Sequence, residues 1–169
     1  MSAPLPPIVL TFAATDPTGG AGIQADLLTL SSMGCHALSV VTAVTVQDTA
    51  GVEGVQPVDA EWVNDQARMV LEDMAVSAFK IGMVGSAENA AVIAEILADY
   101  PDVPVVLDPV LASGRGDELA NEALIDALRD LLIPHTTLLT PNSTEARRLA
   151  ADEDEDEAEL GLHECAARL

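Results

Sequence analysis

Polar residues and glycines in this sequence of 169 residues gather directly after apolar runs. The stretch TDPTGGAGIQADL (15–27) follows one such run and carries Gly19, Gly20 and Gly22, more glycine than one turn requires. Glycine-rich turns between a strand and a helix commonly bind phosphate, because absent side chains leave backbone N–H groups open to a ligand. The turn is therefore a candidate ligand-binding loop. The purely structural alternative is a type I turn that begins at Asp16.

Two common phosphate-binding glycine motifs fit this turn poorly. Gly20-x-Gly22-x-x-Ala25 matches the dinucleotide fingerprint formally, but it does not follow its strand directly. Asp48, the acidic residue after the second strand, lies beyond the expected spacing of about 20 residues. A P-loop requires a GK[ST] sequence, and the only lysine, Lys80, is not part of one.

Carboxyl and amide side chains end or follow later apolar runs in the same way: Asp108, Asn142, Glu145 and Gln47. A carboxylate pair can hold Mg²⁺ through water, which is how this ion is usually bound. The amide of Gln47 offers both donors and an acceptor to the edge of a heterocycle. The structural alternatives are a strand terminator at Asp108, a capping box from Asn142 to Glu145, and a solvated loop residue at Gln47.

The elements that must position these residues alternate between apolar runs of strand length and mostly helical patterns. Strands are expected at 8–14, 36–47, 78–84, 103–110 and 136–140, helices at 22–34, 60–74, 86–100, 121–133 and in 143–169, and a loop or hairpin at 49–59. This order predicts an α/β fold with a doubly wound, mainly parallel sheet and helices on both faces, in one domain over 1–169. Ligands of such sheets bind beyond the C-terminal ends of the strands, where the polar residues above would meet.

Charge and composition exclude several classes of partner. The net charge of −21, from 28 acidic and 7 basic residues, would repel nucleic acids and anionic membranes. An anionic substrate would have to be held by backbone N–H groups, helix N-termini and Mg²⁺. The acidic excess also predicts a protein suited to high salt, and the acidic run 152–157 is expected to be a solvated surface loop.

No feature of the sequence points to export or membrane insertion, so a cytoplasmic location is expected. No apolar run reaches the roughly 18 to 20 residues of a membrane span, and the N-terminus lacks a signal-peptide pattern. Cys35 and Cys165 are expected to be buried structural thiols. A chain that ends in a helix leaves a sheet edge uncovered, which predicts self-association, with a homodimer among the expected partners.

The motifs occur in the order seen in one family of kinases. They are TDPTGGAGIQADL, VTAVTVQDTAGV, KIGMVG, VVLDPVLASGRGDEL and LLTPNSTEA. Over residues 8–150 the sequence resembles the hydroxymethylpyrimidine/phosphomethylpyrimidine kinases of thiamine biosynthesis, which belong to the ribokinase-like superfamily.

The resemblance implies phosphoryl transfer from ATP to the hydroxymethyl group of a pyrimidine, then to its monophosphate, with Mg²⁺ as cofactor. It implies that the glycine-rich turn closes over the pyrimidine, that Gln47 recognises the aminopyrimidine edge, and that Met83 and Val110 pack against the ring. The residues implied are Ala14, Gly20, Asp26, Gln47, Met83 and Val110 at the substrate, Asn142 and Glu145 at the ATP phosphates, and Asp108 and Glu145 at Mg²⁺.

Two departures from the family pattern affect these expectations. Ala14 stands where the family commonly has glycine, which adds a methyl group at a point of close substrate approach. The C-terminal portion of the family, with its GTGC-type anion-hole loop, catalytic residue and much of the adenine site, is absent from these 169 residues. The sequence therefore resembles the substrate-binding part of a C-terminally incomplete ribokinase-like domain and offers no candidate catalytic acid or base. The alternatives are a pyridoxal kinase of the same superfamily and a non-catalytic pyrimidine-binding fragment. For these 169 residues in isolation, pyrimidine binding without ATP turnover is expected rather than activity.

Overall fold

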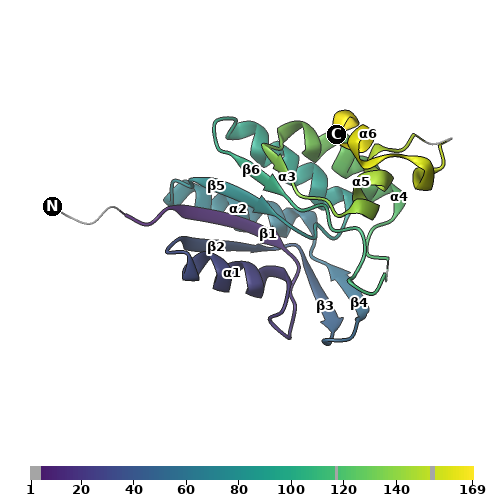
Figure 1. Ribbon diagram of the computed structural model, residues 1–169. Helices are drawn as coiled ribbons and strands as arrows, with labels where there is room; N and C mark the ends of the chain where they lie inside the picture. The colour runs from purple at the N-terminus through teal and green to yellow at the C-terminus, as the bar shows by residue number, and fades with distance from the viewer. Residues whose placement is uncertain (1–4, 117, 153–154) are drawn as a thin grey trace.

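Five parallel strands form the central sheet in the order β2-β1-β5-β6-β7. The computed structural model describes residues 5–116, 118–152 and 155–169. The strands are β1 Ile8–Ala13, β2 His36–Val41, β5 Ala78–Ile81, β6 Val105–Leu107 and β7 Leu138–Leu139. Helices lie on both faces of this sheet, which confirms the predicted α/β architecture (Figure 1).

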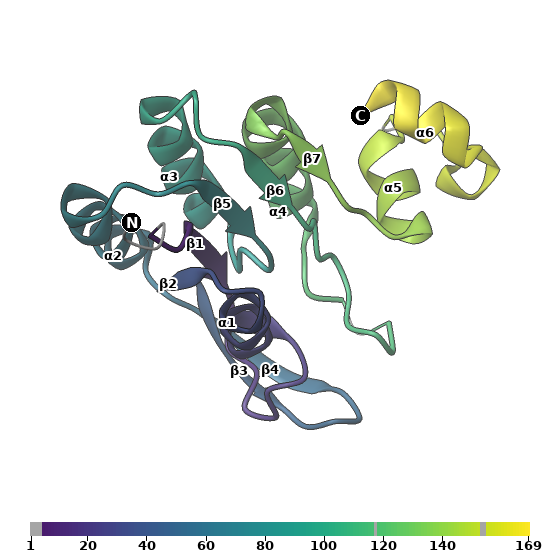
Figure 2. The same cartoon turned by 60° about the vertical axis from the view of Figure 1, so that its left-hand side comes forward.

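The helices divide unequally between the two faces. Helix α1 (Gly22–Ser32) packs against β1 and β2 on one face. On the other face lie α2 (Ala60–Asp73), α3 (Ala87–Asp99) and α4 (Glu122–Ala127), as Figure 2 shows. A π-helical turn, Leu128–Leu132, and a 3₁₀ turn, Ile133–His135, continue α4 toward β7. The predicted helix 121–133 is thus present but changes its winding after its sixth helical residue.

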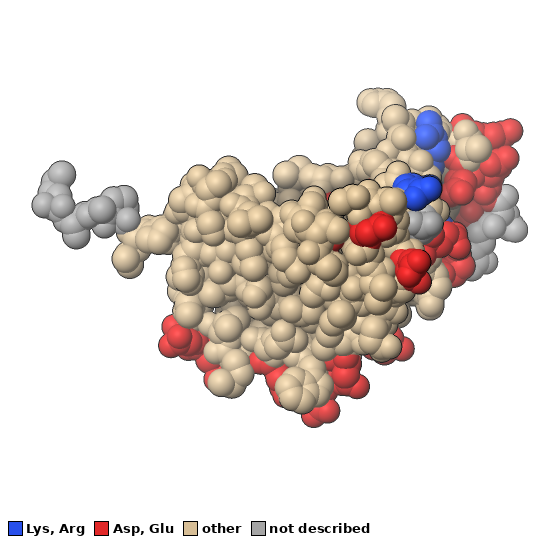
Figure 3. Space-filling view, turned by 90° about the horizontal axis from the view of Figure 1, so that it is seen from below, with Lys and Arg blue, Asp and Glu red and all other residues tan. Residues whose placement is uncertain are grey.

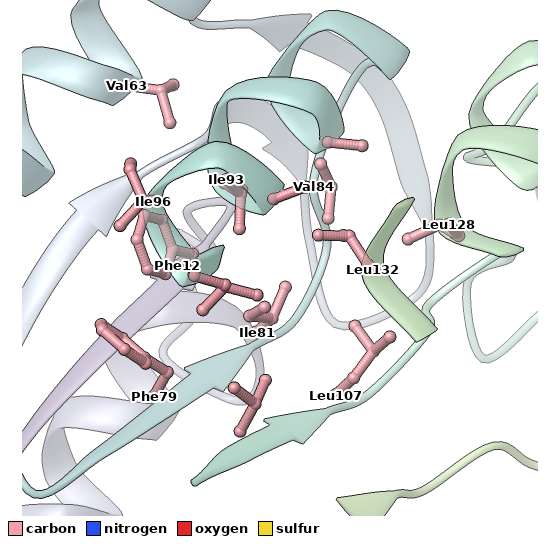
Figure 4. Close-up of a cluster of buried hydrophobic side chains, with 14 of the residues drawn as sticks. Phe12, Val63, Phe79, Ile81, Val84, Ile93, Ile96, Leu107, Leu128 and Leu132 are labelled. Carbon is pink, nitrogen blue, oxygen red and sulfur yellow. The ribbon is translucent and has the colours of Figure 1, made fainter. Parts of the chain in front are cut away.

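The core fills the space between the sheet and the layer of three helices. Phe12 of β1 and Phe79 and Ile81 of β5 are completely buried and point toward this layer (Figure 4). Ile93 and Ile96 of α3 meet them from the other side. Because side chains alternate along a strand, Thr11 and Lys80 point to the opposite face, where α1 lies.

The expected strand 36–47 is two strands in two different sheets, so that prediction was wrong. β2 ends at Val41, opposite the last residue of β1, and β3 (Ala43–Gln47) leaves the sheet to form an antiparallel hairpin with β4 (Val52–Pro57). Thr42 lies between them with its polar groups engaged by other segments. Its N–H donates to the carbonyl of Ala13 and its hydroxyl donates to the carbonyl of Met83.

The C-terminal segment is likewise divided. Helix α5 (Ser143–Ala150) is followed by a short 3₁₀ turn, Glu157–Glu159, and by α6 (Leu162–Arg168), which agrees with the expectation of helical structure in 143–169 interrupted at the acidic run. The acidic run 152–157 lies partly outside the described residues, and its Glu155 is ion-paired with Arg168. Acidic side chains gather at the end of the molecule where these helices lie (Figure 3).

The two cysteines differ in burial. Cys165 is completely buried, as expected, whereas Cys35 is only half-buried. None of the helices in the described ranges is both long and apolar enough to span a membrane.

Candidate functional site

A cavity of about 330 Å³ opens at the C-terminal ends of β1, β5 and β6. Its volume lies near the lower limit of small-molecule sites, about 300 to 1,000 Å³, and therefore suits a single-ring ligand. Six of the nine predicted site residues line it: Ala14, Asp26, Gln47, Met83, Val110 and Asp108. The position agrees with the rule that parallel sheets bind ligands beyond the C-terminal ends of their strands.

The glycine-rich turn is closed by its own hydrogen bonds. The N–H of Gly19 donates to the carbonyl of Asp16 (3.0 Å), which confirms the predicted turn. The carboxylate of Asp16 accepts from the N–H groups of Thr18 and Ala21, each at 2.8 Å, and the N–H of Gly20 donates to the hydroxyl of Thr18. The N–H groups of residues 18–21 are thus engaged within the turn and are not open to a phosphate, contrary to the expectation from the glycines.

The side chain of Asp16 is the reason for this closure. Burial alone would raise the pKa of its carboxyl, but the hydrogen bonds from Thr18, Ala21 and Gly20 together outweigh burial and lower the pKa below its ordinary value. Asp16 is only 2% exposed. A buried carboxylate therefore stabilises the turn from within, in the place where a phosphate-binding loop would receive its ligand.

Close contact between the turn and β1 fixes where α1 begins. Gly22 has φ +57°, and a Cβ atom there would lie 2.5 Å from the carbonyl oxygen of Ala14. Only glycine permits this approach. The N–H of Ile23 donates to the same carbonyl at 2.8 Å. The first turn of α1 is thereby held against Ala14, and Asp26, one turn further on, lines the cavity.

Asp26 is bound by two residues of the sheet beneath it. The hydroxyl of Thr11 donates to Asp26 Oδ2 at 2.7 Å, and Lys80 Nζ lies 3.0 Å from the same oxygen. Lys80 also lines the cavity, but the sequence indicated no role for it beyond the missing P-loop. The available signal was its position as the only lysine of a strongly acidic chain, inside an apolar strand.

The β3–β4 hairpin places Gln47 in the cavity wall. Gln47 is the last residue of β3, at an irregularity in its pairing with β4, and is half-buried. Thr45, two residues earlier, binds the glycine-rich turn: its N–H donates to the hydroxyl of Thr15 (3.1 Å) and its own hydroxyl donates to the carbonyl of Thr15 (2.7 Å). The hairpin and the turn are therefore joined next to the cavity.

Two carboxyl groups, Asp108 and Glu145, lie where the last parallel strands end. Burial raises the pKa of Asp108; the charge of Lys80 opposes this shift and that of Asp26 adds to it. Burial also raises the pKa of Glu145, against hydrogen bonds from the N–H groups of Asn142 and Leu111, and the charge of Asp108 contributes to the increase. The charge of Asp108 thus acts on Glu145, whereas burial, Lys80 and Asp26 set the direction of the pKa shift of Asp108.

Three predicted residues do not line the cavity: Gly20, Asn142 and Glu145. Gly20 is exposed on the outside of the turn. Asn142 is the N-cap of α5 and forms the predicted capping box with Glu145, which is 6% exposed. Asn142 instead faces a separate apolar hollow of about 370 Å³, with Leu162 of α6 among its lining residues. Within the described ranges, no three His, Cys, Asp or Glu side chains are grouped to hold a metal ion.

Comparison with known proteins assigns the family. A family model described as phosphomethylpyrimidine kinase matches residues 16–169. A hydroxymethylpyrimidine/phosphomethylpyrimidine kinase of Streptomyces coelicolor is 44% identical over 164 residues, covering 95% of this chain and 61% of the relative. The corresponding protein of Escherichia coli is 41% identical and is matched over 53% of its length. The chain thus spans less than two thirds of these relatives.

Solved structures of related kinases superpose on this chain. A crystal structure of phosphomethylpyrimidine kinase from Clostridium difficile superposes with a TM-score of 0.80 at 39% identity, covering 89% of this chain and 65% of that one. Pyridoxal kinase from Staphylococcus aureus, in complex with AMP-PCP and pyridoxal, superposes with a TM-score of 0.74 at 29% identity, covering 86% and 51%. From the family match and these likenesses, the chain belongs to the phosphomethylpyrimidine kinase family.

Proposed function

We propose that this chain forms the pyrimidine site of an ATP-dependent kinase of thiamine biosynthesis. The reaction is phosphoryl transfer from ATP to the hydroxymethyl group of 4-amino-5-hydroxymethyl-2-methylpyrimidine, followed by transfer to the resulting monophosphate. The observation that carries the proposal is the cavity at the ends of β1, β5 and β6, with six predicted site residues in its wall. The names of the relatives at 41–46% identity support it.

The cavity wall suits an aminopyrimidine. The amide of Gln47 can donate and accept at once, and this combination complements a ring nitrogen beside an amino group. Met83 and Val110, both half-buried, supply apolar surface for the faces of the ring. The carboxylate of Asp26 supplies a charged acceptor on the α1 side. The methyl group of Ala14, which is 2% exposed, narrows the cavity where the family commonly has glycine.

The carboxyl groups of Asp108, in the cavity wall, and of Glu145, outside it, suit a magnesium ion. Asp108 is half-buried, and burial raises the pKa of its carboxyl group, so a nearby cation would offset an unfavourable charge. Carboxylate oxygens are ligands that Mg²⁺ accepts, often through water. In this proposal Asp108 and Glu145 hold Mg²⁺, Asn142 lies at the ATP phosphates, and the ion neutralises charge on the phosphoryl group when bound.

The runner-up substrate is pyridoxal, because pyridoxal kinases share this fold at 27–30% identity. Higher identity to relatives named for hydroxymethylpyrimidine favours the pyrimidine. A third possibility is a fragment that binds the pyrimidine without transferring phosphate. The lack of a candidate catalytic acid or base in the sequence motivates this third possibility.

A product assay separates these three functions. The purified chain is incubated with ATP, Mg²⁺ and either the pyrimidine or pyridoxal, and phosphorylated products are quantified by mass spectrometry. An active chain would form the pyrimidine monophosphate and, later, the diphosphate, with slower formation of pyridoxal phosphate. Equal rates on both substrates would contradict the assigned specificity. Pyrimidine binding without any phosphorylated product would contradict kinase activity of this chain and support the non-catalytic binding fragment.

A further inference from the structure

Thr11 and Lys80 both bind the same carboxylate oxygen of Asp26. They are register partners on the neighbouring parallel strands β1 and β5, so their side chains leave the sheet side by side, toward α1. Both reach Asp26 Oδ2, at 2.7 Å from the Thr11 hydroxyl and 3.0 Å from the Lys80 ammonium. The other oxygen, Oδ1, accepts no hydrogen bond from the described residues, although Asp26 lines the cavity.

Gly82 leaves the space that the ammonium group occupies. A Cβ atom at this position would lie 2.7 Å from Lys80 Nζ, closer than non-bonded atoms approach. Gly82 itself lines the cavity and is buried. The lysine is therefore held between the backbone at Gly82 and the carboxylate, with its side chain 25% exposed and that of Asp26 18% exposed.

We propose that Thr11 and Lys80 are positioning residues that hold Asp26 Oδ2 and thereby leave Oδ1 directed at the bound pyrimidine. The inference rests on the proposed function, because it assigns the ligand of Oδ1 as the amino or hydroxyl group of that pyrimidine. A carboxylate with one oxygen bound twice loses its freedom to rotate. The ligand then meets a preorganised acceptor and does not have to order it.

A purely structural role would be to fasten α1 to the sheet. This helix has one buried side chain, Ile23, so the contact of Asp26 with the sheet contributes to its docking. The two roles differ in what they predict. Fastening alone affects stability and leaves the affinity of the folded protein for the pyrimidine unchanged, whereas positioning affects affinity at temperatures where every variant is folded.

Calorimetric titration of the pyrimidine into the 169-residue chain tests the proposal. Lys80→Met and Thr11→Val each remove one partner of Oδ2 and should weaken binding about tenfold, the lower end of what a hydrogen bond to a charged group contributes. Lys80→Arg keeps the charge and should recover part of the loss. The matched control is Arg68→Met, which removes the ion pair between Arg68 and Asp99 far along α2 and α3 and should leave affinity unchanged.

A spectroscopic readout keeps the test independent of replacing the lysine. Because Lys80 is the only lysine, a chain labelled with ¹³C-lysine gives a single side-chain Cε resonance. Saturating pyrimidine should shift this resonance in the wild-type chain. Unchanged affinity in folded Lys80→Met and Thr11→Val, or an unmoved Cε resonance with the pyrimidine bound, would overturn the inference and leave the proposed function intact. A wild-type chain that does not bind the pyrimidine would overturn both.

Discussion

At the scale of single residues, the carboxylate of Asp16 decides what the glycine-rich turn can do. It accepts hydrogen bonds from Thr18 and Ala21 inside the turn and leaves the N–H groups of residues 18–21 without a free position for phosphate. The turn therefore acts as a rigid wall of the cavity, to which it contributes Asp16 and Ala21. In the proposed function, the ATP phosphates are therefore bound at the ends of the other strands.

The lowered pKa of Asp16 gives a pH-dependent prediction. A carboxyl whose pKa is lower in the folded than in the unfolded state stabilises the fold above its ordinary pKa of 3.8, and this contribution is lost as the pH falls through the folded value. Asp16→Asn should cost about 1 to 2 kcal/mol of unfolding free energy at neutral pH. The difference from wild type should shrink in acid, as measured by urea unfolding between pH 7 and pH 3.

The control for this prediction is Asp48→Asn, because Asp48 accepts the N–H groups of Ala50 and Gly51 in an exposed turn. It should lose less stability. An Asp16→Asn variant as stable as wild type at neutral pH would show that the carboxylate does not hold the turn.

Six residues of the cavity wall could be predicted from the sequence, but Lys80, the only cation among its described lining residues, could not. Gln47, Met83, Asp108 and Val110 each follow or end an apolar run, and position after a strand is readable from the pattern. Lys80 lies inside its strand, where a lysine is normally a solvated residue. Its partner Asp26 is 54 residues away in the chain, so only the three-dimensional pairing of β1 with β5 brings them together.

At the scale of elements, the division of residues 36–47 into β2 and β3 shows that strand propensity alone does not determine where a strand ends. HALSVVTAVTVQ is uniformly rich in β-branched and small residues and contains no glycine or proline to mark a break. The break at Thr42 comes from β1, which ends at Ala13 and offers no partner beyond Val41. Carbonyl Thr42 O then accepts from Val58 N and Asn89 Nδ2, which lie far along the chain. The hairpin that positions Gln47 therefore depends on tertiary contacts.

The start of α5 offers a prediction that separates capping from nucleotide binding. Asn142 Oδ1 accepts from the N–H groups of Thr144 and Glu145, at 2.9 and 3.0 Å. Asn142→Ala should therefore cost about 1 kcal/mol in urea unfolding. Asn142→Ser retains a capping oxygen and should keep most of this stability. If Asn142 also binds the ATP phosphates, both variants should bind ATP more weakly. Wild-type ATP affinity in Asn142→Ser would show that Asn142 serves only as the N-cap of α5.

At the scale of the whole molecule, the acidic excess is unevenly spread. Acidic side chains crowd the end that carries α5 and α6, while the middle of the face in Figure 3 has few charged groups. Ion pairs offset only a part of this charge, as where Arg148 bridges Glu118 and Glu122. Self-repulsion within the folded chain should consequently reduce its stability when salt is low.

Salt should therefore stabilise the chain at neutral pH. The screening length falls from about 10 Å at 0.1 M to about 3 Å at 1 M salt, which removes most repulsion between surface carboxylates. The thermal unfolding midpoint should rise across a KCl series over this range. The same series near the isoelectric point, about 4.1, is the control and should show a smaller change. A midpoint at neutral pH that does not respond to molar salt would contradict the expected adaptation.

The central claim is that the cavity at the ends of β1, β5 and β6 binds the aminopyrimidine through Gln47. Calorimetric titration of 4-amino-5-hydroxymethyl-2-methylpyrimidine into the wild-type chain and into Gln47→Leu tests it most directly. Gln56→Leu, on the exposed side of the same hairpin, serves as the matched control. We predict one binding site in the wild type and in Gln56→Leu, and affinity at least about tenfold weaker in Gln47→Leu. Absence of binding to the wild type, or equal affinity in all three chains, would contradict the claim.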